Sequence, residues 1–152
     1  MFEKKHKYSV FDIVKWFFNE NRKRMNFEDS EYITNLKLQK LLYYAQGYNL
    51  ARRDNVLFND DFFAWEHGPV IKKVYDRYKV NGSKGIEYDE NFNINVDEET
   101  EKILYEVYNE YGQYSAWKLR NMTHEEDPWK TTPRNQIITK EKIKQYFKER
   151  IA

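Results

Sequence analysis

The sequence of 152 residues contains no cysteine, five glycines, three prolines and three histidines. The absence of cysteine excludes disulfide bonds, thiolate catalysis and cysteine-ligated zinc, and it is compatible with a reducing compartment. The five glycines form neither a GxxxxGK nor a GxGxxG pattern, and the GSKG stretch at 82–85 is interpreted as a loop that ends a helix. No nucleotide-phosphate loop is therefore expected.

Long uncharged runs are also missing. No window approaches the roughly 18 apolar residues that a membrane-spanning helix needs, and the N-terminus lacks the apolar core of a signal peptide. The net charge of +1 is too small for a protein that holds nucleic acid mainly through phosphates. We therefore expect a soluble, cytoplasmic protein whose partner is neither a membrane nor a nucleic acid.

The three histidines, His6, His67 and His124, form no metal or catalytic pattern. None belongs to an HExxH motif, and no second histidine follows at helical distance. Ser115 is not part of a GxSxG nucleophile elbow. We expect no enzymatic activity, no metal and no cofactor, and we keep an enzyme that uses His67 or His124 as the alternative from another functional class.

Aromatic residues, in contrast, are abundant, with 13 Tyr, 10 Phe and 4 Trp. A chain of this length buries roughly 70% of its unfolded surface around one core. The sequence therefore predicts a single compact domain over residues 1–152, with a core built of rings as much as of aliphatic side chains.

The segment Thr34–Arg53 is predicted to be the central helix. Its apolar stripe, spaced three and four apart, consists of Leu38, Leu41, Leu42, Ala45 and Tyr48. The rest of its circumference is largely apolar as well, which is typical of a buried helix. Thr34 is the expected N-cap, and Gly47 would let a second element pack closely.

Further helices are indicated by the same spacing of apolar residues, giving about six in all. Their expected starts are Ser9, Pro69, Asp97, Ser115 and Thr139. Alternating residues at Phe92–Val96 predict a strand that pairs with Ile86–Tyr88 in a small hairpin, and Phe62–Trp65 is a second short extended segment. The predicted fold class is mainly α, with a small β-hairpin.

The stretch Trp65–Val70, with sequence WEHGPV, admits two interpretations. Its tryptophan, histidine and glutamate beside a rigid Gly-Pro pair suit a recognition surface. A buried tryptophan followed by a helix start explains the same residues. Composition and spacing leave both open.

The segment Glu87–Glu110 carries nine acidic residues and one basic residue. Such a run is typical of a solvated helix face. The alternative is an acidic patch that attracts a basic partner.

Several blocks of the chain together resemble the Panacea domain family, which includes SocA-like antitoxins and GepA-like phage-associated proteins. The blocks are LKLQKLLYYAQGYNLA at 36–51, LF at 57–58, AWEHGPVIKKVYDRYK at 64–79, YG with SAWKL at 111–119, and TH with PW at 123–129. The opening SVFDIVKWFF is similar to the first helix of that family.

The resemblance implies an antitoxin that neutralises a cognate protein toxin by direct binding. It also leaves room for a proteolytic adapter that delivers a toxin to a ClpXP-type protease, and for a phage-encoded protein that modulates its host by interaction. We take the candidate partner-binding residues from the two most specific blocks. They are Gln39, Lys40, Tyr43, Trp65, Glu66, His67, Gly68 and Pro69.

Overall fold

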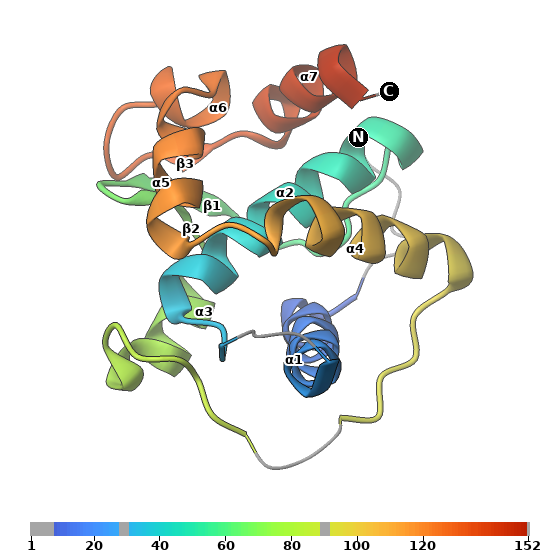
Figure 1. Cartoon of the computed structure of the whole chain (residues 1–152). Helices are drawn as coiled ribbons and strands as arrows, with labels where there is room; N and C mark the ends of the chain where they lie inside the picture. The colour runs from blue at the N-terminus through green and yellow to red at the C-terminus, as the bar shows by residue number, and fades with distance from the viewer. Residues whose placement is uncertain (1–7, 28–30, 89–91, 152) are drawn as a thin grey trace.

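The computed structural model describes residues 8–27, 31–88 and 92–151. Within them the chain is mainly α-helical with one small antiparallel sheet, which confirms the predicted fold class (Figure 1). The helices are α1 (Val10–Phe27), α2 (Asn35–Arg53), α3 (Lys72–Tyr78), α4 (Glu98–Tyr111), α5 (Ala116–His124), α6 (Asp127–Lys130) and α7 (Lys140–Ile151). The strands are β1 (Phe62–Trp65), β2 (Gly68–Val70) and β3 (Ile137–Ile138), and a 3-10 turn follows α3 at Lys79–Asn81.

Helix α2 is the centre of the domain, as predicted. Fifteen of its nineteen residues are buried, so nearly its whole circumference faces protein. Helices α4, α5 and α7 pack against it, and α1 is seen end-on while α2 and α4 lie across the view (Figure 1). The Thr34 hydroxyl accepts the Lys37 amide at 3.1 Å, and Asp54 ends the helix in a left-handed conformation.

The prediction of a hairpin at Ile86–Val96 is wrong. Residues 86–88 and 92–96 form no strand, and the predicted turn at 89–91 lies outside the described residues. The Asn19 side chain of α1 bonds both the carbonyl and the amide of Phe92, at 2.7 and 2.9 Å. A helix side chain thus satisfies the backbone groups that a partner strand would otherwise have paired.

The hairpin lies instead at β1 and β2, and β3 completes the sheet in the order β2-β1-β3. Pro69 is consequently not the first residue of a helix, because it pairs with Ala64 in β2 and α3 begins three residues later. An edge strand accommodates proline because its outer side needs no N–H donor. Phe62–Trp65 is extended, as predicted.

The remaining helix starts agree with the prediction, since α1, α4, α5 and α7 begin directly after Ser9, Asp97, Ser115 and Thr139. Helix α1 runs for 18 residues, from Val10 to Phe27. The stretch between α5 and α7 contains the single helical turn α6 and the strand β3. The N-caps Asp97 and Ser115 are confirmed, since each side chain accepts an amide of the following turn.

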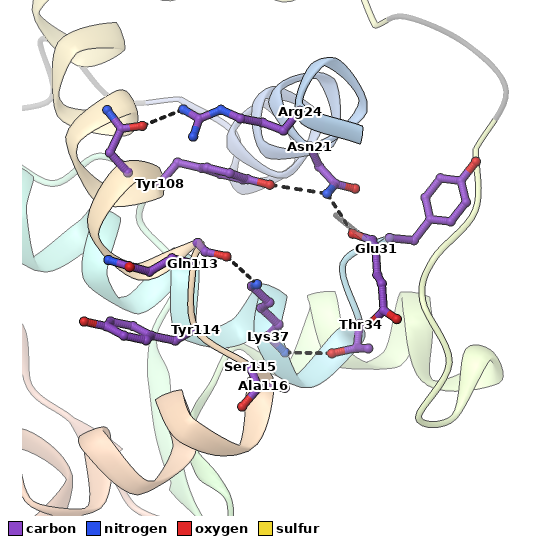
Figure 2. Close-up of a pocket in the computed structure, with 13 residues that line it drawn as sticks. Asn21, Arg24, Glu31, Thr34, Lys37, Tyr108, Gln113, Tyr114, Ser115 and Ala116 are labelled. Atoms are coloured by element: carbon purple, nitrogen blue, oxygen red, sulfur yellow. Dashed lines mark hydrogen bonds between the residues drawn. The ribbon is translucent and has the colours of Figure 1, made fainter. Parts of the chain in front are cut away.

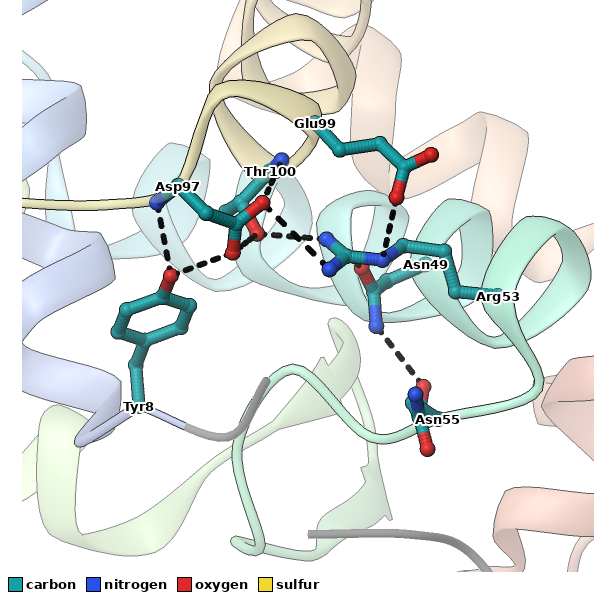
Figure 3. A network of polar contacts seen from close by, with 7 residues as sticks. All are labelled: Tyr8, Asn49, Arg53, Asn55, Asp97, Glu99 and Thr100. Carbon is teal, nitrogen blue, oxygen red and sulfur yellow. Dashed lines mark hydrogen bonds and ion pairs between the residues drawn. The ribbon is translucent and has the colours of Figure 1, made fainter. Parts of the chain in front are cut away.

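A polar network joins the N-terminal segment to the ends of α2 and α4 (Figure 3). Tyr8 donates its hydroxyl to Asp97 at 2.6 Å, and Arg53 lies 3.4 Å from Asp97 and 2.6 Å from the Thr100 hydroxyl. Burial alone would raise the pKa of Asp97, but the hydrogen bonds from Tyr8 and Thr100 and the charge of Arg53 hold it well below its usual range.

Gly47 lets α7 approach the centre of α2. A Cβ atom built on Gly47 would lie 2.3 Å from two ring carbons of Phe147, which is 2% exposed. Because the ring also contacts Tyr43, Tyr44 and Tyr48, it has little room to move aside.

We expect Gly47→Ala to destabilise the protein by about 1 to 3 kcal/mol through overpacking against Phe147. On an exposed helix the same change would stabilise by up to about 1 kcal/mol. Urea denaturation of Gly47→Ala, Phe147→Leu and the double variant measures this. The two changes should be non-additive, with Phe147→Leu relieving the clash. A Gly47→Ala protein as stable as the wild type would contradict the close approach.

Candidate functional site

The blocks that carry the family resemblance meet at the β1–β2 turn. Lys40 of α2 is fully buried beneath it, and its Nζ donates to the Pro69 carbonyl at 3.4 Å. Gly68 has a φ of +111°, and a Cβ there would lie 2.6 Å from Lys40 Cε and 2.8 Å from Thr123 Oγ1. Glycine is therefore required both by the backbone conformation and by the packing of these side chains.

A stack around Trp129 holds the turn from its other side. The Trp129 indole N–H donates to the Trp65 carbonyl at 2.7 Å. His124 stacks on the Trp129 ring at 3.9 Å, and the Arg134 guanidinium lies 3.7 Å from the ring centroid. The Arg134 guanidinium also donates to two backbone carbonyls, those of Trp129 and Thr132.

Four basic side chains lie close together around the turn. Burial, and then the charge of Arg120, lower the pKa of Lys40 to about 7. Burial also lowers the pKa of His124, as do the charges of Arg120, Lys40 and Arg134, although a hydrogen bond to the Glu66 backbone opposes them. We call Lys40, Arg120, His124 and Arg134 the basic corner.

Gln39 and Tyr43, predicted to bind a partner, are buried and bonded within the chain. Gln39 accepts the Ile71 amide at 2.9 Å and so fixes the start of α3. Tyr43 and Tyr44 each donate a hydroxyl to Glu126, at 3.0 and 2.8 Å. Burial is the largest influence on Glu126 and raises its pKa to about 7.

An aromatic groove of about 540 Å³ opens beside the turn. Its apolar lining comes from Leu36, Trp65, Val70 and Tyr75, and its remaining lining residues are Asn35, Gln39, Glu66, His67, Lys79, Gly82, Ser83 and Asn135. The Trp65 and Tyr75 rings meet edge to face with centroids 5.1 Å apart. Tyr75 remains 37% exposed, so the groove offers aromatic surface to a partner.

The structure thus divides the predicted partner-binding residues into two groups. Five of them, Gln39, Lys40, Tyr43, Gly68 and Pro69, are buried. The other three face outward, with Trp65 half-buried and Glu66 and His67 exposed. Gln39 also borders the groove, at 1% exposure.

Two residues that sequence reasoning missed complete the exposed surface. Arg120 of α5 donates its Nε–H to His67 Nδ1 at 3.0 Å. Its guanidinium lies 4.3 Å from the ring centroid of Trp117, which is 54% exposed. Trp117 belongs to the SAWKL block, but helical spacing alone could not show that its ring faces solvent.

A second hollow, of about 590 Å³, lies between α1, α2, α4 and α5 (Figure 2). It is polar, and its donors are largely paired inside the chain: Lys37 Nζ reaches the Gly112 carbonyl at 2.6 Å, and Asn21 Nδ2 reaches the Glu31 carbonyl at 2.9 Å. None of the predicted partner-binding residues lines it. We interpret it as a polar hollow that arises where these helices pack together.

The acidic run Glu87–Glu110 makes ion pairs within the protein. Arg52 pairs with both carboxylate oxygens of Glu106, and Arg53 lies 3.3 Å from Glu99. Part of the negative charge is therefore compensated by α2. Its role in attracting a basic partner stays a prediction.

Two further searches cover the described residues. They contain no group of three or more His, Asp or Glu side chains placed to hold a metal ion. In the same part of the chain, no helix combines the length and the apolar character that crossing a membrane requires.

The raised pKa of Glu126 predicts a fall in stability with rising pH. Between about pH 4.5 and pH 7 the folded protein retains a proton that the unfolded chain has lost, so the free energy of unfolding decreases by on the order of 3 kcal/mol. The Tyr43 and Tyr44 hydroxyls and the Arg150 charge oppose this effect of burial without cancelling it. Urea denaturation across this range should show the decrease, and Glu126→Gln, which cannot ionise, should remove it. Parallel pH profiles for the two proteins would contradict the assignment.

Lys40 predicts the opposite trend at higher pH. Between about pH 7 and pH 10.5 the unfolded chain holds a proton that the folded protein lacks, so the free energy of unfolding rises by on the order of 5 kcal/mol. Lys40→Met keeps the length of the side chain without the charge. The free energy of unfolding of Lys40→Met, taken relative to that of the wild type, should therefore be higher at pH 6 than at pH 10. A difference that is constant with pH would refute a buried, titrating amine.

Comparison with known proteins agrees with this assembly of motifs. Residues 38–130 match the family described as "Antitoxin SocA-like, Panacea domain". A segment of 54 residues is 48% identical to the protein named "Antitoxin SocA" of Caulobacter vibrioides (strain NA1000 / CB15N), and it covers 36% of this chain and 29% of that relative. No solved structure matches the chain. Since the family match spans more than half of its length, this chain belongs to the SocA-like antitoxin family of Panacea domains.

Proposed function

We propose that this chain is an antitoxin that neutralises a protein toxin by direct binding, and that the toxin contacts the aromatic groove and the turn residues Trp65, Glu66 and His67. The observation that carries the proposal is the placement of the WEHGPV block. Its buried members anchor the turn internally, and its exposed members border an open groove. A surface held in one conformation before binding costs little ordering entropy when a partner docks.

Trp65 is the candidate anchor of this surface. Its ring is half-buried against Tyr75, while its backbone carbonyl is held by Trp129. Tryptophan is enriched among the few residues that dominate binding energy at protein interfaces. Replacement of the ring leaves the backbone contact to Trp129 in place, so the fold and the interface can be tested separately.

Neutralisation by occupancy has a defined stoichiometry. A protein that only covers its target protects in proportion to its amount, whereas an enzyme protects at a small fraction of an equivalent. A proteolytic adapter protects only when the protease is present. One titration therefore distinguishes the three functions.

We expect the purified chain to protect against the toxin encoded in the neighbouring reading frame at about one equivalent, without added protease. Trp65→Ala should weaken toxin binding by roughly thirtyfold, because it removes about 2 kcal/mol of contact energy. Binding is measured by calorimetry, protection by the restored activity of the reaction that the toxin blocks, and folding by thermal melts.

The matched control is Ile137→Ala, which removes an exposed apolar side chain of the same sheet outside the groove. It should bind the toxin like the wild type. Protection at a tenth of an equivalent that is lost in folded His67→Ala or His124→Ala would indicate catalysis. Protection that needs a ClpXP-type protease would indicate an adapter. Equal binding by Trp65→Ala and the wild type would remove the groove from the interface.

A further inference from the structure

The protein contains two stacks of the same three residue types. In the inner stack, His124 and Arg134 lie against Trp129. In the outer stack, Arg120 lies over the Trp117 ring, and the His67 ring lies beside it, with the His67 and Trp117 centroids 5.7 Å apart and the ring planes tilted by 51°. Trp129 is half-buried and its indole N–H is bonded, whereas 54% of Trp117 faces solvent.

Arg120, the arginine of the outer stack, has N–H donors that are not used in hydrogen bonds within the described residues. A guanidinium has five N–H donors. The Nε donor of Arg120 is used by His67, and one Nη1 donor is used by the Asn121 side chain, each at 3.0 Å. The other donors have no partner in the part of the chain that the structure describes, and no described carboxylate forms an ion pair with Arg120. Arg134, by contrast, donates to two carbonyls.

The surroundings of the outer stack favour a negative partner. Arg120 belongs to the basic corner, where its charge contributes to lowering the pKa of Lys40 and of His124. Acidic residues of the run Glu87–Glu110 form ion pairs with Arg52 and Arg53 at the C-terminal end of α2 and with Lys102 inside the run. Because arginine stays protonated, Arg120 and Arg134 keep their positive charge, and no carboxylate among the described residues forms an ion pair with either of them.

We propose that the outer stack, made of His67, Trp117 and Arg120, binds a side-chain carboxylate on the surface of the toxin. The carboxylate takes the unused guanidinium donors of Arg120 in a bidentate pair, and the apolar part of the neighbouring toxin residue packs on the exposed Trp117 ring. His67 positions Arg120 through Nδ1, which requires a neutral imidazole. This inference rests on the proposed function and names the chemistry of the partner.

Geometry favours a protein carboxylate over a nucleic-acid phosphate. The site offers one fixed guanidinium and one exposed ring. A nucleic-acid strand needs a track of positive charge for consecutive phosphates. With a net charge of +1, the chain is poorly suited to supply one.

The first experiment uses a defined probe and needs no toxin. A short capped peptide of Glu, Phe and Gly is titrated into the ¹⁵N-labelled protein, beside a twin with Gln in place of Glu and a single-stranded oligothymidine. We expect the Glu peptide to shift the Arg120 Nε–Hε and Trp117 indole resonances saturably, and the Gln twin to leave them unchanged. No shift with the Glu peptide overturns the proposal. Tighter binding of oligothymidine at the same resonances would overturn it in favour of nucleic acid.

The second experiment uses the toxin. Arg120→Gln should lower toxin affinity by roughly tenfold or more, as expected for losing charge-assisted hydrogen bonds. Arg120→Lys should restore only part of the affinity, because an ammonium cannot form the bidentate pair. The matched control is Lys118→Gln, which removes the same charge from an exposed position of α5. Its effect should stay within about twofold, since long-range attraction between exposed charges is screened.

The outcomes separate the two proposals. Equal losses of toxin affinity for Arg120→Gln and Lys118→Gln would mean that only the net charge matters. That result would overturn the carboxylate contact but not the proposed function of toxin binding. A wild-type protein that does not bind the toxin overturns the proposed function, and the peptide titration then decides the carboxylate site alone. Thermal melts of each variant show whether a loss reflects unfolding.

Discussion

The burial of α2 on all sides is the constraint on which the rest of the structure depends. Every polar side chain on such a helix must find its partner inside the protein, or its desolvation goes uncompensated. Gln46 therefore bonds the Leu57 amide and the Phe58 carbonyl, both at 2.7 Å, and Asn49 bonds the Asn55 carbonyl at 2.8 Å. These bonds fix the course of the chain that follows the helix. The central helix thus organises the loops around it as well as the core.

The same constraint accounts for the motif residues near the start of α2. Lys40 keeps its amine beneath the β1–β2 turn, where the Pro69 carbonyl accepts it and where only a glycine leaves room at position 68. Gln39 holds the amide that begins the next helix after the turn. The LQK and HGPV blocks are therefore two halves of one internal contact. Most of their residues serve to hold the turn, and few of them face outward.

A turn held in this way presents its exposed side chains on a rigid base. Trp65 borders an open groove, and Arg120 of α5 donates a hydrogen bond to His67 and lies over the Trp117 ring of the same helix. Rigid aromatic and arginine side chains suit recognition because little conformational freedom is lost on binding. Burial of Glu126 and Lys40 lowers the free energy of unfolding by an amount that depends on pH. The combined loss of stability from the two groups is largest near neutral pH.

The sequence by itself determined the central helix, the caps at Thr34, Asp97 and Ser115, and the blocks that mark the family, because these patterns are local in the chain. Tertiary structure alone decided the strand pairing, in which Phe62 meets Ile138, since pairing between distant segments leaves no local pattern. It also decided which motif residues are buried and which are exposed. Exposure depends on what the rest of the chain covers, and spacing along one helix does not contain that information.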